Sequence, residues 1–191
     1  MQLLKCPFAD WGYLVFFDTE VHRIPTSGLL KTLAVIPKLE AQWKIIYDFK
    51  PTEECFQNTR GGSRLLGLGI RGGGGQKAGI YFFPNVDFIL TLEAYIHSDE
   101  GLPSEHLEPL VKVWCNRITP IGEWTRMEVS HEMEDGEYFL SLRIGGTEVG
   151  RKEVTVPAFR DMAEVNVVIG SLMEGRAQPG FIRGLVVLQK E

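Results

Sequence analysis

The feature that most constrains the fold lies in residues 121–149, where two alternating runs flank the pair Asp135-Gly136. Successive side chains of a strand point to opposite sides, so a period of two predicts extended chain. An Asp-Gly pair between two such runs is a strong hairpin signal, because the tight turn needs a positive φ. Gly145-Gly146 predicts a second turn directly afterwards. The segment therefore predicts a β-hairpin that leads at once into a further turn.

The alternation also sorts the residues of this hairpin into faces. In the first strand, one face carries Trp124, Arg126, Glu128 and Ser130, and the other carries Thr125, Met127 and Val129. In the return strand, one face carries Tyr138, Leu140, Leu142 and Ile144, and the other carries Phe139, Ser141 and Arg143. Each strand is therefore expected to present two different sets of side chains to its surroundings.

Strand signals recur along the rest of the chain, bounded by Gly, Pro or Asn. The expected strands are 43–50, 63–70, 80–83, 88–96, 110–117, 163–171 and 181–189, with 13–18 as an edge strand. Only 103–109 and 158–162 allow a helical turn, and Pro109 stops the first from growing. About ten short strands without a long helix predict an all-β sandwich or barrel.

Length and charge narrow the class of protein. A chain of 191 residues with 44% hydrophobic residues fits one domain with a full core. The net charge of −5, with scattered Lys and Arg, argues against nucleic acid as a partner, because neutralising phosphates needs a clustered basic excess. No uninterrupted apolar run approaches the roughly 18 residues of a transmembrane helix. We therefore expect a single domain with no nucleic-acid partner and no transmembrane segment.

The cellular compartment stays open at the level of sequence. Cys6, Cys55 and Cys115 form no CxxC pair, so a zinc knuckle is not expected. One disulfide with a leftover thiol and three reduced thiols fit equally well. The apolar block 12–17 is too short and too acidic at its borders for a signal-peptide core. Either the protein is cytosolic, or a secretory leader has been removed.

Three blocks of sequence carry a resemblance to a known family. They are WKIIYDFKP at 43–51, the hairpin segment from GEW at 122 to Val149, and the pair 165–170 with 179–185. In order and spacing they resemble the concanavalin A-like jelly-roll superfamily, in particular its laminin-G-like branch. The resemblance implies a two-sheet antiparallel jelly-roll sandwich as one domain over 28–191. Residues 1–27 would form an N-terminal extension or an edge strand.

This resemblance implies a range of functions, because such a fold does not fix one. Glycan, protein or calcium ligands would be held by the rim loops or the concave face. We favour a non-enzymatic recognition module, lectin-like or adhesion-like, that binds a glycan or a protein surface outside the cell or at its surface. One alternative is a glycoside hydrolase that uses carboxylates such as Glu132 and Glu137. Another is a structural subunit that assembles into an oligomer.

Two motifs with known chemistry are better explained by turns. Residues 67–72 spell GxGxxG, but more glycines and a strand follow, whereas a dinucleotide site needs the N-terminus of a helix. Residues 132–137 approximate the ExDxxE pattern of one glycosidase group. The hairpin turn falls in the middle of that run and would point its carboxylates into solvent. Neither motif is therefore expected to carry catalysis or cofactor binding.

Metal binding is expected to be absent or limited to calcium at the rim. Calcium needs six to eight oxygen ligands from converging loops, and no compact Dx[DN]xD loop occurs. The acidic residues considered as calcium ligands are Asp87, Asp99, Glu100, Glu132, Glu134 and Asp135. The histidines His22, His97, His106 and His131 are expected in loops or at strand ends, with no spacing that makes a metal cage.

The tryptophans suggest where a sugar would bind. Trp43 and Trp124 fall at core positions of the matched blocks and are expected to be structural, whereas Trp11 and Trp114 lie outside them. Either of these two is a candidate stacking platform, although burial is the commoner fate of a Trp. The predicted binding residues are Arg71, Gln76, Trp114, Asn116 and Arg117, which combine one ring with several hydrogen-bond donors. The alternative is that these are ordinary surface polar groups beside a buried Trp.

Overall fold

The computed structural model describes residues 11–25, 30–53, 63–70, 76–84, 90–96, 111–115, 120–154, 162–170 and 180–190. Within these ranges the chain forms thirteen β-strands and no α-helix. No helix in this described part is long and apolar enough to cross a membrane. The prediction of an all-β chain is therefore confirmed for the residues that the structure describes.

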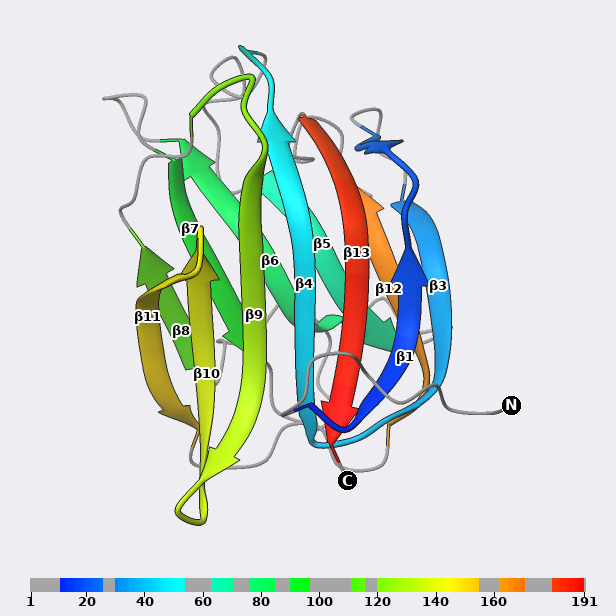
Figure 1. The fold of residues 1–191 in the computed structure, drawn as a ribbon, viewed down its shortest axis with the longest axis vertical. Coiled ribbons are helices and arrows are strands. Elements are labelled where there is room, and N and C mark those ends of the chain that lie inside the picture. Colours follow the sequence, from blue (N-terminus) through cyan, green and yellow to red (C-terminus); the bar gives the residue numbers. More distant parts are fainter. Residues whose placement is uncertain are drawn as a thin grey trace.

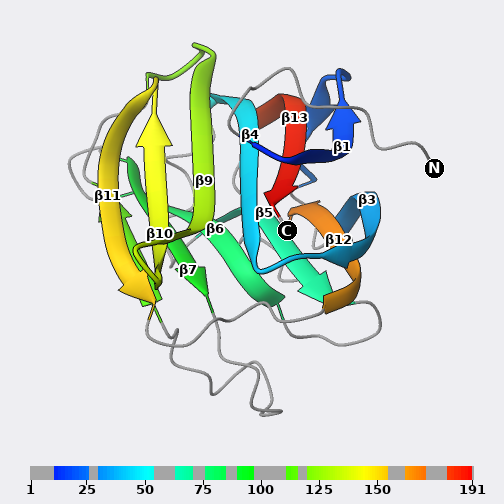
Figure 2. The same ribbon diagram turned by 60° about the horizontal axis from the view of Figure 1, so that its bottom comes forward.

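The strands form two antiparallel sheets that face each other (Figure 1, Figure 2). The seven-stranded sheet runs in the order β1 (Tyr13–Asp18), β13 (Gly180–Lys190), β4 (Gln42–Pro51), β9 (Thr125–Glu134), β10 (Glu137–Ile144) and β11 (Thr147–Val154), with β2 (His22–Arg23) also beside β13. The six-stranded sheet runs in the order β3 (Leu30–Leu39), β12 (Met162–Gly170), β5 (Ser63–Ile70), β6 (Gln76–Pro84), β7 (Leu90–Ile96) and β8 (Val111–Cys115). This is the two-sheet sandwich predicted from the sequence.

The β-hairpin predicted around Asp135-Gly136 is present in the structure. Asp135 and Gly136 take φ values of 51° and 89°, and the strands on either side pair from Glu134 with Glu137. Gly145 and Gly146 form the second turn, with φ values of 57° and 78°. Both turns use the left-handed region that Gly, Asn and Asp tolerate best. The turn chemistry therefore fixes the register of β9, β10 and β11.

Three strands were not expected from the sequence. They are β2, β3 and β11. The strand β3 contains Pro37, which usually demotes a run, but β3 lies at the edge of its sheet, where proline is tolerated. Of the two segments that allowed a helical turn, 103–109 lies outside the described residues, and Met162 at the end of the other begins β12.

The core between the sheets is organised by β4. Its inward residues Trp43, Ile45, Tyr47 and Phe49 are at most 2% exposed. Phe49 packs against Gly180, where a Cβ would lie 2.7 Å from the Phe49 ring and 2.6 Å from the Lys50 carbonyl oxygen. Gly180 also has a φ of 155°. Only glycine fits at the start of β13, because no side chain can be accommodated there.

His131 lies inside the core and corrects the expectation of loops and strand ends for the histidines. It sits in the middle of β9, fully buried, with its ring 6.0 Å from Trp43 and 5.0 Å from Tyr138. Its Nδ1 contacts the Ala41 carbonyl oxygen at 2.6 Å, so Nδ1–H is the donor. Burial lowers the pKa of His131, and the bond to Ala41 offsets this only in part. The imidazole is therefore neutral in the folded protein near pH 7.

We predict that stability falls on acidification because of His131. Its folded pKa is depressed, so below about pH 6.5 the unfolded chain takes up a proton that the folded chain does not. The free energy of unfolding should decrease from pH 7 to pH 5, by at most about 1.4 kcal/mol per pH unit from this group. Urea titrations of the wild type and of His131→Phe would measure this. The variant should be less stable at pH 7 but show a shallower decrease, and equal slopes would contradict the prediction.

Candidate functional site

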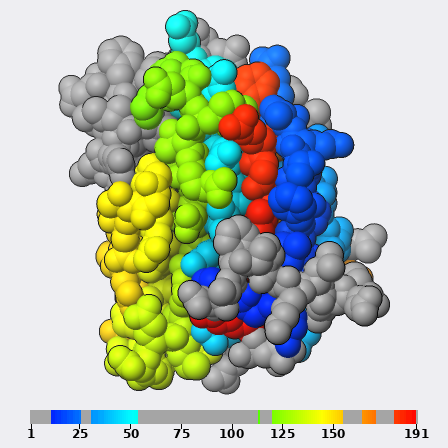
Figure 3. All heavy atoms as spheres, in the orientation of Figure 1, coloured from blue at the N-terminus to red at the C-terminus, as the bar shows by residue number. Residues whose placement is uncertain are grey.

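A row of charged residues crosses the outer face of the seven-stranded sheet. Asp48 on β4 is the register partner of Arg126 on β9 and of Arg183 on β13. Tyr47 and Phe49, on either side of Asp48, are buried in the core, so strand alternation directs Asp48 outward. Figure 3 views this face, with β13 in red, β4 in cyan and β9 in green running side by side.

Asp48 bridges the two arginines with its two oxygens. Oδ1 accepts from Arg126 Nε at 2.7 Å, and Oδ2 accepts from Arg183 Nε at 3.4 Å. The side chain of Asp48 is 19% exposed, whereas those of Arg126 and Arg183 are 48% and 42% exposed. The row therefore holds two partly exposed guanidinium groups against one carboxylate, and each contacts that carboxylate through its Nε.

Trp124 stands beside this row, directly before β9. The guanidinium carbon of Arg183 lies 4.2 Å from the centroid of its ring, a cation–π contact. The residue is half-buried. Gly122, with a φ of 77°, donates its N–H to the Pro51 carbonyl oxygen at 2.9 Å, which ties the preceding turn to the end of β4. We call Trp124, Arg183, Asp48 and Arg126 the Trp124 cluster.

A β-bulge in β13 brings Arg183 into the row. The register between β13 and β4 shifts between Arg183 and Val186, and Gly184 within the shift has a φ of 60°. Such bulges insert chain on one strand and re-aim its side chains. Gly184 adopts the left-handed conformation that a bulge of this kind requires. The alignment of Arg183 with Asp48 therefore depends on this local irregularity.

The position of Trp124 corrects the expectation that it belongs to the core. It is half-buried on the outer side and is absent from the buried clusters of the described residues. The sequence did contain the signal, because Trp124 shares its face with Arg126 and Glu128, opposite Met127 and Val129. The period-two pattern was therefore a better guide than the position of Trp124 in the matched block.

Two other tryptophans are buried. Trp43 is 1% exposed in the main core, as expected. Trp11 is 8% exposed and packs on Ile46, Val186 and Leu188 on the outer face of the seven-stranded sheet. Lys44 Nζ and Lys190 Nζ lie 4.1 Å and 4.5 Å from its ring centroid. Trp11 therefore covers the sheet and is not an open stacking platform.

The binding residues predicted from the sequence are only partly described. Arg71, Asn116 and Arg117 lie outside the described residues. Gln76 begins β6, and Trp114 lies in β8, both in the six-stranded sheet. Trp114 pairs with Glu93, which pairs with Tyr81, so Trp114 is five residues from Gln76 along the strand direction. That offset is about 16 Å. The backbone thus places the two in different rows, and the predicted loop site remains a prediction.

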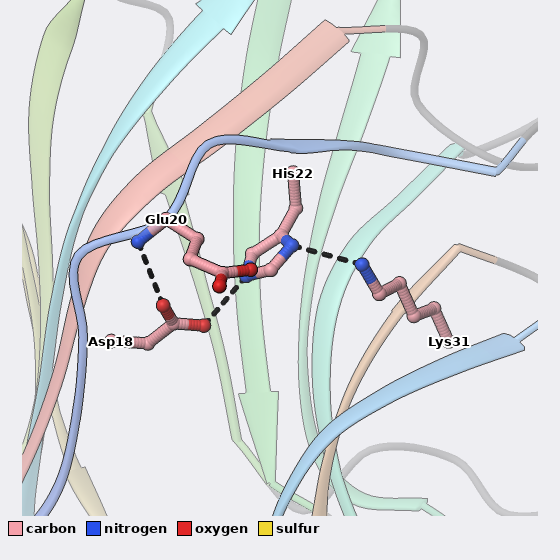
Figure 4. Close-up of polar contacts among 4 residues, drawn as sticks. All are labelled: Asp18, Glu20, His22 and Lys31. Carbon is pink, nitrogen blue, oxygen red and sulfur yellow. Dashed lines mark hydrogen bonds and ion pairs between the residues drawn. The ribbon is translucent and has the colours of Figure 1, made fainter.

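A second polar cluster lies where the edges of the two sheets meet (Figure 4). His22 Nε2 contacts Asp18 Oδ2 at 2.6 Å, and Lys31 Nζ contacts His22 Nδ1 at 2.9 Å. The backbone N–H of Glu20 donates to Asp18 Oδ1 at 2.8 Å. Asp18 and His22 belong to β1 and β2, whereas Lys31 belongs to β3 of the other sheet. We call these four residues the His22 cluster.

The His22 cluster contains a candidate metal site that was not predicted from the sequence. Ligand atoms of Asp18, Glu20 and His22 lie within 4.8 Å of one another, the one such group in the described ranges. An ammonium group can only donate, so Nδ1 of His22 is the acceptor from Lys31 and Nε2 carries the ring proton. A neutral imidazole that bound a metal through Nε2 would instead carry its proton on Nδ1, against Lys31. This arrangement therefore fits a proton between His22 and Asp18 better than a metal ion.

The described carboxylates considered for calcium or catalysis are either paired with a basic residue or exposed at the hairpin turn. Glu132 lies 3.5 Å from Lys44 Nζ, and Glu134 accepts from Arg151 Nη2 at 2.6 Å. That hydrogen bond lowers the pKa of Glu134, which is opposite to what a general acid needs. Asp135 and Glu137 are exposed at the hairpin turn, as expected. Asp87, Asp99 and Glu100 lie outside the described residues.

The chain resembles known proteins in its fold, whereas no family model and no curated protein sequence matches it. Among solved structures, the heptameric SAP-like pentraxin of Limulus polyphemus has 16% identity and a TM-score of 0.61, covering 89% of this chain and 75% of the pentraxin. The ligand-binding domain of botulinum neurotoxin serotype D, in complex with N-acetylneuraminic acid, has 11% identity and a TM-score of 0.60, covering 90% of this chain and 39% of that one.

The fold is a concanavalin A-like jelly roll. Enzymes share it, since alginate lyase Aly36B has 14% identity and a TM-score of 0.55, covering 90% of this chain and 80% of the lyase. At these identities the concanavalin A-like fold is what the likeness establishes. It does not single out the laminin-G-like branch, which remains a prediction.

The His22 cluster yields a prediction about stability. Burial alone would raise the pKa of Asp18, but the hydrogen bonds from His22 and Glu20 outweigh it and the net pKa is lowered. The ionised carboxylate therefore stabilises the fold above about pH 3.8, and this contribution is lost as pH falls through the folded pKa. Asp18→Asn should lower the free energy of unfolding by about 1 kcal/mol at pH 7 and by less at pH 3.

Glu20→Gln provides the matched control for this measurement. It removes a neighbouring carboxylate but keeps the backbone N–H that donates to Asp18. Thermal unfolding of both variants at pH 7 and pH 3 would test the prediction. An equal loss of stability in Glu20→Gln and Asp18→Asn would show that negative charge in general stabilises this edge, and not the hydrogen bond between Asp18 and His22.

Proposed function

We propose that this chain is a non-enzymatic recognition module that binds a glycan through the Trp124 cluster. The observation that carries the proposal is a half-buried indole beside two exposed guanidinium groups and a carboxylate. Sugar hydroxyls can bond to the outward N–H groups of Arg126 and Arg183 and to Asp48. The apolar face of a sugar ring can pack on the accessible part of Trp124. The cluster thus combines the two kinds of contact that sugar binding uses.

The comparisons support this proposal at the level of the fold. The toxin domain was solved with N-acetylneuraminic acid, and a CBM40 domain of the Ruminococcus gnavus IT-sialidase was solved with α2,3-sialyllactose. A concanavalin A-like sandwich can therefore present a surface for sugars. We further propose that recognition occurs outside the cell or at its surface, as the laminin-G-like resemblance implies. Fractionation of cells that express the full protein would test this location.

We predict that Trp124→Ala lowers glycan affinity about tenfold or more, because both the stacking surface and the support for Arg183 are lost. A glycan array would identify the ligand, and titration calorimetry would compare the wild type with the variant. Circular dichroism and thermal unfolding would confirm that the variant is folded. An array without hits would redirect the search to a protein partner, or to a self-assembling subunit if a stable oligomer forms.

The loop site predicted from sequence supplies the control variants. Trp114→Ala and Arg71→Ala should leave affinity unchanged if the Trp124 cluster is the binding site. Affinity lost in those two variants and kept in Trp124→Ala would overturn our assignment in favour of the loop site. We also propose that binding needs no metal, because Glu132 and Glu134 are occupied by Lys44 and Arg151. Loss of binding in EDTA would instead indicate calcium.

The competing function is a glycoside hydrolase, which the resemblance to the concanavalin A-like superfamily implies. The alginate lyase shows that the fold can hold an enzyme, although a lyase cleaves by elimination and not by hydrolysis. Retaining hydrolysis needs two carboxylates about 5 Å apart across a scissile bond, one with a raised pKa. Glu137 is exposed at the hairpin turn and Glu132 lies beside Lys44, so we predict no hydrolysis of β-glucans or galactans. Activity of the wild type that disappears in Glu137→Gln would refute the recognition-only function.

A further inference from the structure

The charges of the Trp124 cluster indicate which class of glycan it takes. We infer that the ligand carries a carboxylate on its sugar, of the uronic or sialic acid type, and that Arg183 binds this group while Trp124 contacts the attached ring. This inference rests on the proposed function, since it names the ligand of the same site. It does not follow from that function, because many sugar-binding sites take neutral glycans.

The charges within the row are not balanced. Asp48 offers one negative charge to two guanidinium groups, so the row carries one surplus positive charge. Lys50 and Glu128, which flank the row on the same face, carry opposite charges, and Glu128 also has Arg143 as its register partner. The protein as a whole has a net charge of −5. The net negative charge of the protein repels an anion, so any attraction must come from the positive charge of this row.

Asp48 contacts its two arginine partners at unequal distances. The contact with Arg126 is 2.7 Å, a short charge-assisted hydrogen bond. The contact with Arg183 is 3.4 Å, beyond the usual range for such a bond. Asp48 therefore holds Arg126 more closely than Arg183, so Arg183 keeps the larger share of its donor capacity. A second planar carboxylate would complete the coordination of Arg183, because the guanidinium fork matches two parallel oxygens.

A related arrangement elsewhere on the sheet serves as an internal reference. The guanidinium carbon of Arg151 lies 4.1 Å from the ring centroid of Phe139, and its Nη2 donates to Glu134 at 2.6 Å. This arrangement also places an arginine on an aromatic ring beside a carboxylate. It differs in that one arginine meets one carboxylate at short distance, so the charges balance. Of these two arrangements, the Trp124 cluster is therefore the one that has more guanidinium groups than carboxylates.

The position of Trp124 favours a carboxylate that is attached to a sugar ring over a small free anion. Arg183 stacks on the indole, so an anion held by Arg183 brings its attached group next to the ring. A small inorganic anion would gain the charge contact alone, whereas a sugar acid would gain the ring contact too. Trp124 and Arg183 would therefore act together, one on the carboxylate and the other on the ring that bears it.

The test compares oligogalacturonate with its carboxyl-reduced form, which keeps the sugar ring and loses the charge. Sialyllactose and its carboxyl-reduced form make a second pair. Calorimetry on the wild type should show about tenfold or more tighter binding of at least one acid than of its neutral counterpart, with the preference falling at high salt. Arg183→Gln should abolish this preference, and Arg151→Gln, the matched control, should retain it. Arg183→Lys keeps the charge without the fork and should retain only part of the preference.

The outcomes separate this inference from the proposed function. Equal binding of acid and neutral forms, lost in Trp124→Ala, would overturn the inference and leave glycan recognition intact. Binding of neither form, together with an empty glycan array, would overturn both. Tighter binding of a sulfated oligosaccharide than of any carboxylated one would overturn the carboxylate in favour of a sulfate. An acid preference that survives Arg183→Gln in folded protein would remove Arg183 from the site.

Discussion

The structure depends first on the strict alternation of β4, the strand at the centre of the seven-stranded sheet. Its inward side chains, from Trp43 to Phe49, fill the core, and its outward Asp48 organises the Trp124 cluster. Pairing with β13 on one side and β9 on the other fixes both faces at once. A shift of one residue would exchange the two sets, burying Asp48 and exposing Phe49. Core packing and the candidate site are therefore set by the same register.

Much of the fold followed from local sequence. The Asp135-Gly136 turn and the alternating runs beside it predicted a hairpin that the structure contains. The density of strands predicted a sandwich or a barrel, and the family resemblance implied the two sheets that the structure has. The structure differs from the prediction where contacts with neighbouring strands outweigh the local preference of the sequence. β3 tolerates Pro37 because it lies at an edge. His131 enters the core because the Ala41 carbonyl oxygen accepts a hydrogen bond from its Nδ1–H and aromatic rings flank it. Such partners are set by tertiary contact, so local sequence does not reveal them.

The candidate site was harder to predict for a related reason. Arg183 and Asp48 are 135 positions apart, and they align only through the bulge at Gly184. Trp124 was assigned to the core by its place in a matched block, although its own alternation put it with Arg126 and Glu128. The His22 cluster likewise joins β2 to Lys31 of the other sheet. A sequence shows which residue types are present, but not which strands will bring them together.

The place of β13 in the chain has a consequence for biosynthesis. Among the described strands it is the last to leave the ribosome, yet it lies between β1 and β4 and supplies Arg183. Before β13 inserts, a nascent chain holds Asp48 and Arg126 but lacks the guanidinium that stacks on Trp124. The central seam of the seven-stranded sheet closes in the same event that completes the cluster. Competence to bind at the proposed site would therefore arrive only with β13, so nascent chains that lack β13 would not capture ligand.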